Sequence, residues 1–169
     1  MVEKTYPVYS LINEVMPAPE GKDTEGEWVE LFNQSGAEID LSGWYLDDAE
    51  GKSSPFKIPE GTVLGPYGFV LFSEPGLGLS FKNSEDVVRL LNPNKQLSQQ
   101  VNYAGAQENW SYAKNAVGQF EWTPLFTPGY DNDFPPPPKS YVIGSVVFER
   151  VLPNPEGKDS GNEQVVLGN

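Results

Sequence analysis

The sequence predicts an all-β fold, and three observations support this prediction. The chain holds 17 glycines and 16 prolines among its 169 residues, spread along its whole length, which is typical of many short strands joined by turns. No long segment keeps the apolar period of an amphipathic helix. Aromatic residues make up 12% of the chain, and this share indicates a packed core rather than a disordered chain.

The stretch Glu27–Leu46 contains the clearest strand–turn–strand pattern in the sequence. In an extended strand over Glu27–Phe32, alternate side chains point to opposite faces. Val29 and Leu31 then share an apolar face, which we expect to enter the core. Asn33–Gly36 follows and supplies residues that tolerate the dihedral angles of a turn.

Two tryptophans of this stretch are expected to lie in different surroundings. Trp44 follows the tight Ser42–Gly43 turn and shares a strand face with Leu46. We expect Trp44 to anchor the core, since a buried Trp removes on the order of 200 Å² from water. Trp28 lies on the strand face opposite Val29, so it is the candidate for an exposed interaction residue, with burial under a covering loop as the alternative.

Other short segments complete the predicted strands. Val8–Met16 is the first strand candidate, and Pro17–Gly26 is a loop rich in proline, glycine and charge. Phe69–Phe72 is a continuous apolar run, which predicts a strand buried on both faces. Asp86–Leu91 and Gln96–Tyr103 are predicted to form a hairpin. Further short strands are predicted at Ile39–Leu41, Phe56–Ile58, Trp110–Ala113 and Phe120–Trp122.

The C-terminal part of the sequence repeats an earlier part. Residues 133–140 hold four consecutive prolines and are predicted to be an extended polyproline II linker, with docking to an aromatic groove as the alternative. Val151–Asp159 matches Val15–Asp23, and the register continues without a gap to Asn169. We therefore expect residues 141–169 to be the opening β-hairpin of an incomplete second copy, either cut at a boundary within a tandem array or packed on a sandwich.

Charge and missing residue types exclude several functions. Asp and Glu number 24 against 11 Lys and Arg, which gives a net charge of −13. This charge repels a phosphate backbone and argues against direct nucleic-acid binding. Cysteine and histidine are absent, which removes thiolate nucleophiles, disulfides and Ser–His dyads, so we expect no enzyme. The apolar runs are too short for membrane insertion.

The loop before Trp28 is the candidate metal site. Its carboxylates belong to Glu20, Asp23, Glu25 and Glu27. Ca²⁺ takes roughly six to eight oxygen ligands, which clustered carboxylates on a glycine-containing loop supply. Lys22 lies inside the loop, and the spacing is not that of an EF-hand. Ca²⁺ is thus the cofactor that the sequence suggests, if any, and an ordinary solvated acidic turn is the alternative.

A second acidic cluster consists of Asp47, Asp48 and Glu50. Paired carboxylates perform acid–base catalysis in glycosidases when they face each other across a cleft. Sequence neighbours on a turn point apart instead. We therefore expect this cluster to be a solvated turn and not a catalytic pair.

Several motifs, taken together and in chain order, resemble the lamin tail domain in its bacterial and archaeal form. The resemblance covers about Tyr9–Asn132, and the set is specific although each motif alone is weak. The motifs are Asn13–Pro17, Glu27–Asn33, Asp40–Trp44, Pro59–Thr62, Tyr67–Phe72, Trp110–Ala113 and Thr127–Gly129.

The resemblance implies an immunoglobulin-like β-sandwich over residues 8–132 and a non-catalytic role. In animals such domains end nuclear intermediate filaments and bind proteins and chromatin. In prokaryotes they are accessory modules of secreted or surface proteins, often beside hydrolase or nuclease domains. This sequence is acidic and has no coiled-coil heptads, so the filament role and direct DNA contact are not expected here.

We therefore expect an interaction, adhesion or spacer module of a larger exported protein, located outside the cell or at its surface. The first residues lack the apolar run of a signal peptide. We therefore expect either a cytoplasmic protein or a piece of a longer exported one. The alternative function is a carbohydrate- or Ca²⁺-binding accessory domain that positions a neighbouring hydrolase or nuclease. The expected partners are proteins, including a second copy of the chain through residues 141–169.

Overall fold

The computed structural model describes residues 5–137, 142–143 and 146–147. The described part is built of short β-strands, and its helix α1 (Asp23–Gly26) is a single turn. None of the described helices is long and apolar enough to cross a membrane. The strands are β1 (Ile12–Met16), β2 (Trp28–Phe32), β3 (Ile39–Asp40), β4 (Tyr45–Asp47), β5 (Phe56–Lys57), β6 (Val63–Leu64), β7 (Phe69–Ser73), β8 (Glu85–Leu91), β9 (Leu97–Ala104), β10 (Ser111–Lys114), β11 (Phe120–Thr123), β12 (Val142–Ile143) and β13 (Val146–Val147).

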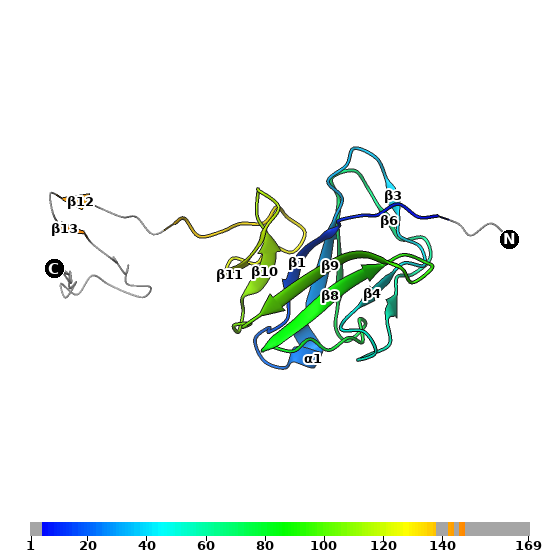
Figure 1. The fold of residues 1–169 in the computed structure, drawn as a ribbon, viewed down its shortest axis with the longest axis horizontal. Helices are drawn as coiled ribbons and strands as arrows, with labels where there is room; N and C mark the ends of the chain where they lie inside the picture. Colours follow the sequence, from blue (N-terminus) through cyan, green and yellow to red (C-terminus); the bar gives the residue numbers. More distant parts are fainter. Residues whose placement is uncertain (1–4, 138–141, 144–145, 148–169) are drawn as a thin grey trace. The chain divides into compact units, whose positions relative to one another are not determined.

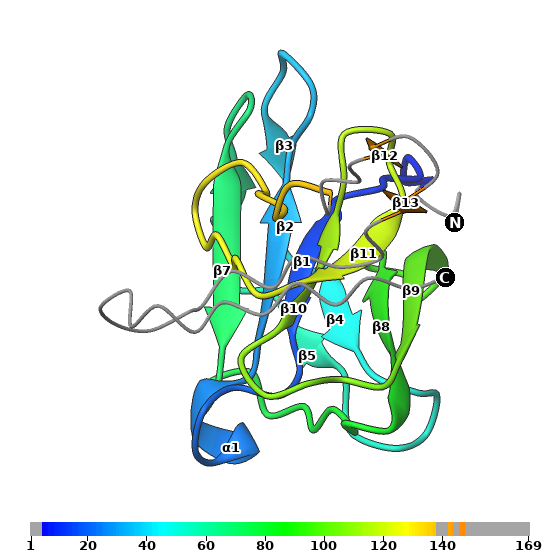
Figure 2. The same ribbon diagram turned by 90° about the vertical axis from the view of Figure 1, so that its left-hand side faces the viewer.

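Residues up to Phe134 form one compact unit made of two packed antiparallel sheets. One sheet has the strand order β11-β10-β1-β2-β7, and the other has the order β5-β4-β8-β9. β8 and β9 pass in front of β1 and β2 in Figure 1, and in Figure 2 β4, β8 and β9 lie to the right of β7, β2 and β1. β3 and β6 form a separate pair. This arrangement confirms the predicted immunoglobulin-like β-sandwich.

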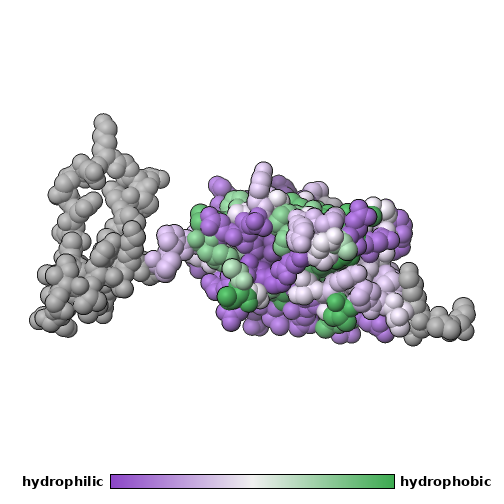
Figure 3. Space-filling view, turned by 90° about the horizontal axis from the view of Figure 1, so that it is seen from above, coloured by the Kyte–Doolittle hydropathy of each residue, from purple (hydrophilic) through white to green (hydrophobic). Residues whose placement is uncertain are grey.

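A hydrophobic core fills the space between the sheets. Trp44 is 2% exposed, which confirms the predicted core anchor, and the ring of Tyr9 packs on it with 5.4 Å between centroids. Val29 and Leu31 are fully buried, as the alternation in β2 predicts. The surface seen in Figure 3 is mostly hydrophilic, with hydrophobic residues scattered among polar ones.

β1 and β2 pair so that residues of the same kind lie opposite each other. Val15 lies opposite Val29, and Glu14 lies opposite Glu30. The two valines belong to the core. Because side chains alternate along a strand, the two glutamates point to the other side of the five-stranded sheet, which we call the outward face.

The first strand is shorter than the predicted Val8–Met16, because β1 begins only at Ile12. Side chains of β9 hold this part of the chain, and Leu11 O also accepts a hydrogen bond from Phe32 N of β2 at 2.7 Å. Ser98 Oγ accepts a hydrogen bond from Tyr9 N at 2.7 Å, and Gln99 Oε1 accepts one from Ile12 N at 2.7 Å. These long-range bonds leave no trace in the alternation pattern of the segment.

The prediction that Phe69–Phe72 is buried on both faces is wrong. This run forms most of β7, which is an edge strand of the five-stranded sheet. Val70 and Phe72 pack against the core, whereas Leu71 points outward and is 43% exposed. A continuous apolar run does not distinguish a central strand from an edge strand whose outward face is also apolar.

Only part of the region after the sandwich is described. Residues 133–137 of the predicted linker have no regular secondary structure. β12 and β13 pair as an antiparallel hairpin, with Val142 opposite Val147. The rest of residues 141–169, where the second copy is predicted, lies outside the described residues. The predicted domain boundaries therefore stay predictions.

Candidate functional site

The structure does not bring together the carboxylates of the predicted calcium site, which belong to Glu20, Asp23, Glu25 and Glu27. Glu25 accepts a hydrogen bond from Lys22 Nζ at 2.9 Å, and Asp23 accepts one from Asn83 Nδ2 at 3.3 Å. Within the described ranges, no group of three or more acidic, His or Cys side chains is placed to hold a metal ion. The local backbone explains this separation. The α1 turn places Glu25 beside Lys22, whereas the side chain of Glu27, just before β2, is buried.

Glu27 is a buried carboxyl that ties the β7–β8 loop to β2. It is 1% exposed, and its Oε1 accepts a hydrogen bond from Phe81 N at 3.1 Å. Burial raises the pKa of Glu27 to about 8, against the opposing effect of that hydrogen bond, and the charges of Asp23 and Glu74 raise it further. Glu27 is therefore mostly protonated at neutral pH and acts as a structural residue.

The second acidic cluster forms ion pairs and is not the solvated turn that we expected. Asp47 is 2% exposed and binds the guanidinium of Arg89. Asp48 is fully buried and lies 3.6 Å from Lys52 Nζ. Glu50 alone stays exposed. Asp47 and Asp48 turn to different partners, so they do not face each other as a catalytic pair would.

Two buried glutamates on the outward face were not predicted as a site. Glu14 and Glu30 lie opposite each other on β1 and β2, and both are 0% exposed. Burial raises the pKa of both carboxyls, that of Glu30 to about 7, and the charge of Glu14 adds to the shift in Glu30. Alternation with Val29 and Leu31 places Glu30 on the face where an exposed carboxylate is ordinary, so no local signal marks its burial.

The segment Thr127–Asn132, which we call the closing loop, covers this glutamate pair. Thr127 N donates to both carboxyl oxygens of Glu14 at 3.2 Å, and Gly129 N donates to Glu30 Oε2 at 2.5 Å. Gly129 has a φ of 85°, a conformation that strains any side chain but suits glycine. In Figure 2 the yellow segment after β11 crosses in front of β2 and β7. The two carboxyls thus anchor the loop to the sheet.

Asn132 fastens the end of the closing loop. Its Nδ2 donates to the backbone oxygens of Asn13 at 3.2 Å and Lys114 at 2.8 Å, and its Oδ1 accepts from Asn13 Nδ2 at 3.0 Å. Asn13 Nδ2 also donates to Glu30 at 2.9 Å. One polar network therefore joins β1, β2, β10 and the closing loop.

Trp28 is not exposed as the strand alternation suggested. The residue is 9% exposed and lies opposite Met16 of β1 and Ser73 of β7. Alternation correctly separates Trp28 from Val29, but it does not reveal that the outward face is covered as well. The role of Trp28 as an interaction residue stays a prediction, with little of its surface available.

Residues 10–105 match the model of a family described as Lamin Tail Domain, and this match covers more than half of the 169 residues. The chain belongs to the lamin tail domain family. Members of this family have an immunoglobulin-like fold, are often involved in protein interactions and are generally non-catalytic. No curated protein matches the chain.

The matched part of the lamin tail domain runs from just before β1 to the residue after β9. The β10–β11 hairpin and the closing loop lie beyond it. Glu14 and Glu30 therefore belong to the matched strands, whereas the backbone donors that bind them come from a segment outside the match.

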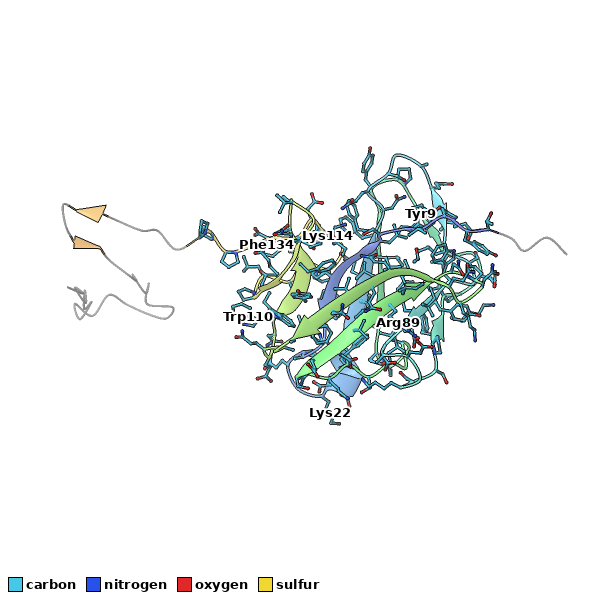
Figure 4. All side chains as sticks on the ribbon, in the orientation of Figure 1. Tyr9, Lys22, Arg89, Trp110, Lys114 and Phe134 are labelled. Carbon is cyan, nitrogen blue, oxygen red and sulfur yellow. The ribbon has the colours of Figure 1, made fainter. Side chains whose placement is uncertain are left out.

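A groove of about 400 Å³ opens on the outward face of the lamin tail domain, beside the closing loop. The stacked rings of Phe32 and Phe69, with 4.4 Å between centroids, line it. Lys114 contributes from the end of β10, where Figure 4 labels it. Gln34 is an exposed amide at the rim. The groove thus combines an apolar surface with several amide groups, the ammonium group of Lys114 and the carboxylate of Asp131.

A second groove of about 490 Å³ lies elsewhere on the lamin tail domain and is rich in tyrosine. Tyr6, Tyr9 and Tyr45 line it together with Asp40 and Glu60. Aromatic grooves of this kind bind polyproline segments in other protein folds. Docking of the proline-rich residues 133–140 to such a groove stays a prediction.

Proposed function

We propose that the chain is a non-catalytic interaction and spacer module of a larger, exported, multi-domain protein. The observation that carries this proposal is that the carboxyls with raised pKa values hold loops of the fold in place. Shifted pKa values usually mark catalytic candidates, but Glu14 and Glu30 hold the closing loop and Glu27 holds the β7–β8 loop. Membership of a family that often serves protein interaction supports the same conclusion.

The internal repeat supports a tandem arrangement. Among the positions that both copies share, Val15, Glu27, Val29, Leu31 and Asn33 are buried in the first copy, whereas Glu20, Gly21 and Lys22 are exposed. The outward-facing positions differ between the copies, since Arg150, Gln164 and Val166 stand where the first copy has Glu14, Trp28 and Glu30. Two copies that share core residues but differ at outward-facing positions suit a tandem array in which each module binds a different partner.

Self-association is tested by the mass of the protein in solution. We expect the full chain to dimerise with increasing concentration in light scattering, and a version ending at Phe134 to stay monomeric, because the incomplete second copy predicted in residues 141–169 would leave strand edges that seek partners. A full-length variant with Val165→Ser and Leu167→Ser is the matched control and should also be monomeric. Two monomers, or two equal dimers, would reject association through residues 141–169.

Carbohydrate binding in the groove beside the closing loop is the second candidate function. It is favoured by the stacked Phe32–Phe69 pair and the nearby Gln34 and Lys114. No tryptophan lines this groove, so nuclear magnetic resonance titration with oligosaccharides is the suitable test. We expect a neutral oligosaccharide to shift signals of the groove in the native chain and not in a Phe69→Ala variant. Shifts that are absent or unchanged in the variant would reject this function.

A further inference from the structure

We propose that the open edge of β7 is a docking site for an extended strand of a positively charged partner protein. The other three edge strands of the two described sheets are protected. β5 has two residues, one of them Lys57. β9 is bridged to Tyr9 by Ser98, and Trp122 Nε1 also donates to Ala104 O of β9 at 3.1 Å. β11 contains the charged Glu121. Short length, charge and cover are the usual protections of sheet edges.

β7 is neither short nor charged, and its central Leu71 stays 43% exposed although the closing loop crosses in front of the strand in Figure 2. Phe69–Ser73 is five residues long and contains no charged residue and no proline. It pairs with β2 on one side, and no described strand pairs with its other side. Figure 2 shows β7 at the left margin of the sheet. An uncharged edge of this length is a ready template for another strand.

The hydrogen bonds between β2 and β7 indicate which backbone groups face the open side. Asn33 N donates to Gly68 O at 3.0 Å. Hydrogen-bonded pairs recur at every second residue of an antiparallel ladder, so Val70 and Phe72 also bond to β2. The N–H and C=O groups of Leu71, at the centre of the strand, therefore face away from β2 and are available to an added strand.

The side chains beside this edge indicate an apolar partner strand. Leu71 is 43% exposed on the outward face. Phe69 also lies on this face and stacks on Phe32 of β2. A strand added to β7 would place its own side chains next to Leu71, where apolar or β-branched residues cover the most surface.

Charge favours a basic partner over a second copy of the chain. The net charge is −13, β7 has no Lys or Arg, and Glu74 follows it directly. Two copies would repel each other along this edge, whereas a strand flanked by lysines is attracted. This docking site is therefore distinct from the self-association proposed above and does not depend on residues 141–169.

The test uses the full chain labelled with nitrogen-15 and a synthetic peptide. The probe is an acetylated, amidated peptide of alternating valine and threonine with a lysine at each end, and its control has glutamates in place of the lysines. Before addition, the amide of Leu71 should exchange hydrogen faster than those of Val70 and Phe72. The lysine peptide should shift the Leu71 signal and slow its exchange about tenfold or more, and the glutamate peptide should bind more weakly.

Two variants of the same residue separate the backbone and side-chain contributions. Leu71→Pro removes the outward N–H while leaving the bonds to β2 intact, as edge strands permit, and it should abolish binding. Leu71→Thr keeps the N–H and should weaken binding. Val63→Thr, at a residue 53% exposed on β6, is the control and should bind like the native chain.

Several results would overturn the proposal. These are no shift at millimolar peptide, shifts centred away from β7, equal binding of both peptides, or full binding by Leu71→Pro. If Leu71→Pro fails to fold, as judged by the indole signal of Trp44, Leu71→Thr decides instead, and undiminished binding by that variant overturns the proposal. Loss of self-association on removing residues 141–169 would not affect any of these readouts.

Discussion

Glu14, Glu27 and Glu30 are buried and take part in none of the ion pairs of the described residues, unlike Asp47, which pairs with Arg89. The charge of Lys52 partly opposes the raised pKa of Glu27. Burying an unpaired charge is costly, so a buried carboxyl shifts its pKa upward and holds its proton. In this protein each of the three carboxyls accepts a backbone hydrogen bond from a distant loop. At the scale of the residue, buried carboxyls with raised pKa values thus hold distant loops in place.

The free energy of unfolding is expected to fall as pH rises from about 5 to about 8. The pKa is about 8 for Glu27 and about 7 for Glu30 in the folded chain, against an ordinary value of 4.5. Between these limits the folded state binds more protons than the unfolded state, so stability decreases with pH. The stability that these two carboxyls contribute is fully present below the ordinary pKa of 4.5 and is lost as the pH rises through their pKa values in the folded chain. One pKa unit corresponds to about 1.4 kcal/mol, so the loss measured by urea unfolding should reach several kcal/mol.

The Glu27→Gln variant identifies the source of this pH dependence. An amide cannot ionise, so stability of the variant should change less between about pH 5 and 8 than stability of the native chain. Glu25→Gln changes an exposed residue and should keep the native slope. Identical slopes in the native chain and in Glu27→Gln would contradict the assignment.

Trp44→Ala should lower the free energy of unfolding by about 3–5 kcal/mol, because it removes a large side chain from a core that cannot collapse fully. Trp44 is 2% exposed and contacts the rings of Tyr6 and Tyr9. Tyr130, at 75% exposure, supplies the control, and Tyr130→Ala should cost less than about 0.5 kcal/mol. A loss below about 1 kcal/mol for Trp44→Ala in urea unfolding would contradict its place as core anchor.

At the scale of the element, the closing loop shows how a segment without regular structure is fixed. Its backbone donors meet Glu14 and Glu30, and Asn132 bonds to β1 and β10. Buried polar groups are costly when unsatisfied, so a complete network of this kind holds one arrangement of the loop. The loop in turn keeps water from the two carboxyls.

Asn132→Ala should lower the free energy of unfolding by about 2–3 kcal/mol, because it leaves buried polar atoms of Asn13 and Lys114 without partners. Chemical unfolding measures the loss. Asn102→Ala, at an exposed position of β9, is the matched control and should be nearly neutral. In a double-mutant cycle with Asn13→Ala, the two losses should not add, since the side chains share one network. Fully additive losses would argue against that network.

At the scale of the whole molecule, the net charge is −13, but the loop of the predicted calcium site does not gather its carboxylates. We expect the melting temperature in millimolar Ca²⁺ to equal that with a chelator when sodium chloride keeps the ionic strength constant. Because the ionic strength is equal, general screening of the strongly acidic chain is the same in both samples and cannot cause a difference. A rise specific to Ca²⁺ would show that the loop rearranges around the ion, since a ligand that binds only the folded state stabilises it.

The sequence by itself determined the strand-rich sandwich, the burial of Trp44, Val29 and Leu31, and the family. Each of these follows from local information, namely alternation, turn residues and motifs in order. Alternation also correctly placed Trp28 and Val29 on opposite faces of their strand. Alternation states which residues share a face of a strand.

Only the tertiary structure decided what covers each face. Glu14 and Glu30 are buried because Thr127, 113 residues after Glu14, closes over them, and no local pattern encodes that contact. Leu71 is exposed because β7 lies at a sheet edge, which depends on strand order and not on its own sequence. The physical reason is that burial and pKa depend on atoms brought near by the whole fold, whereas strand propensity depends on neighbours along the chain.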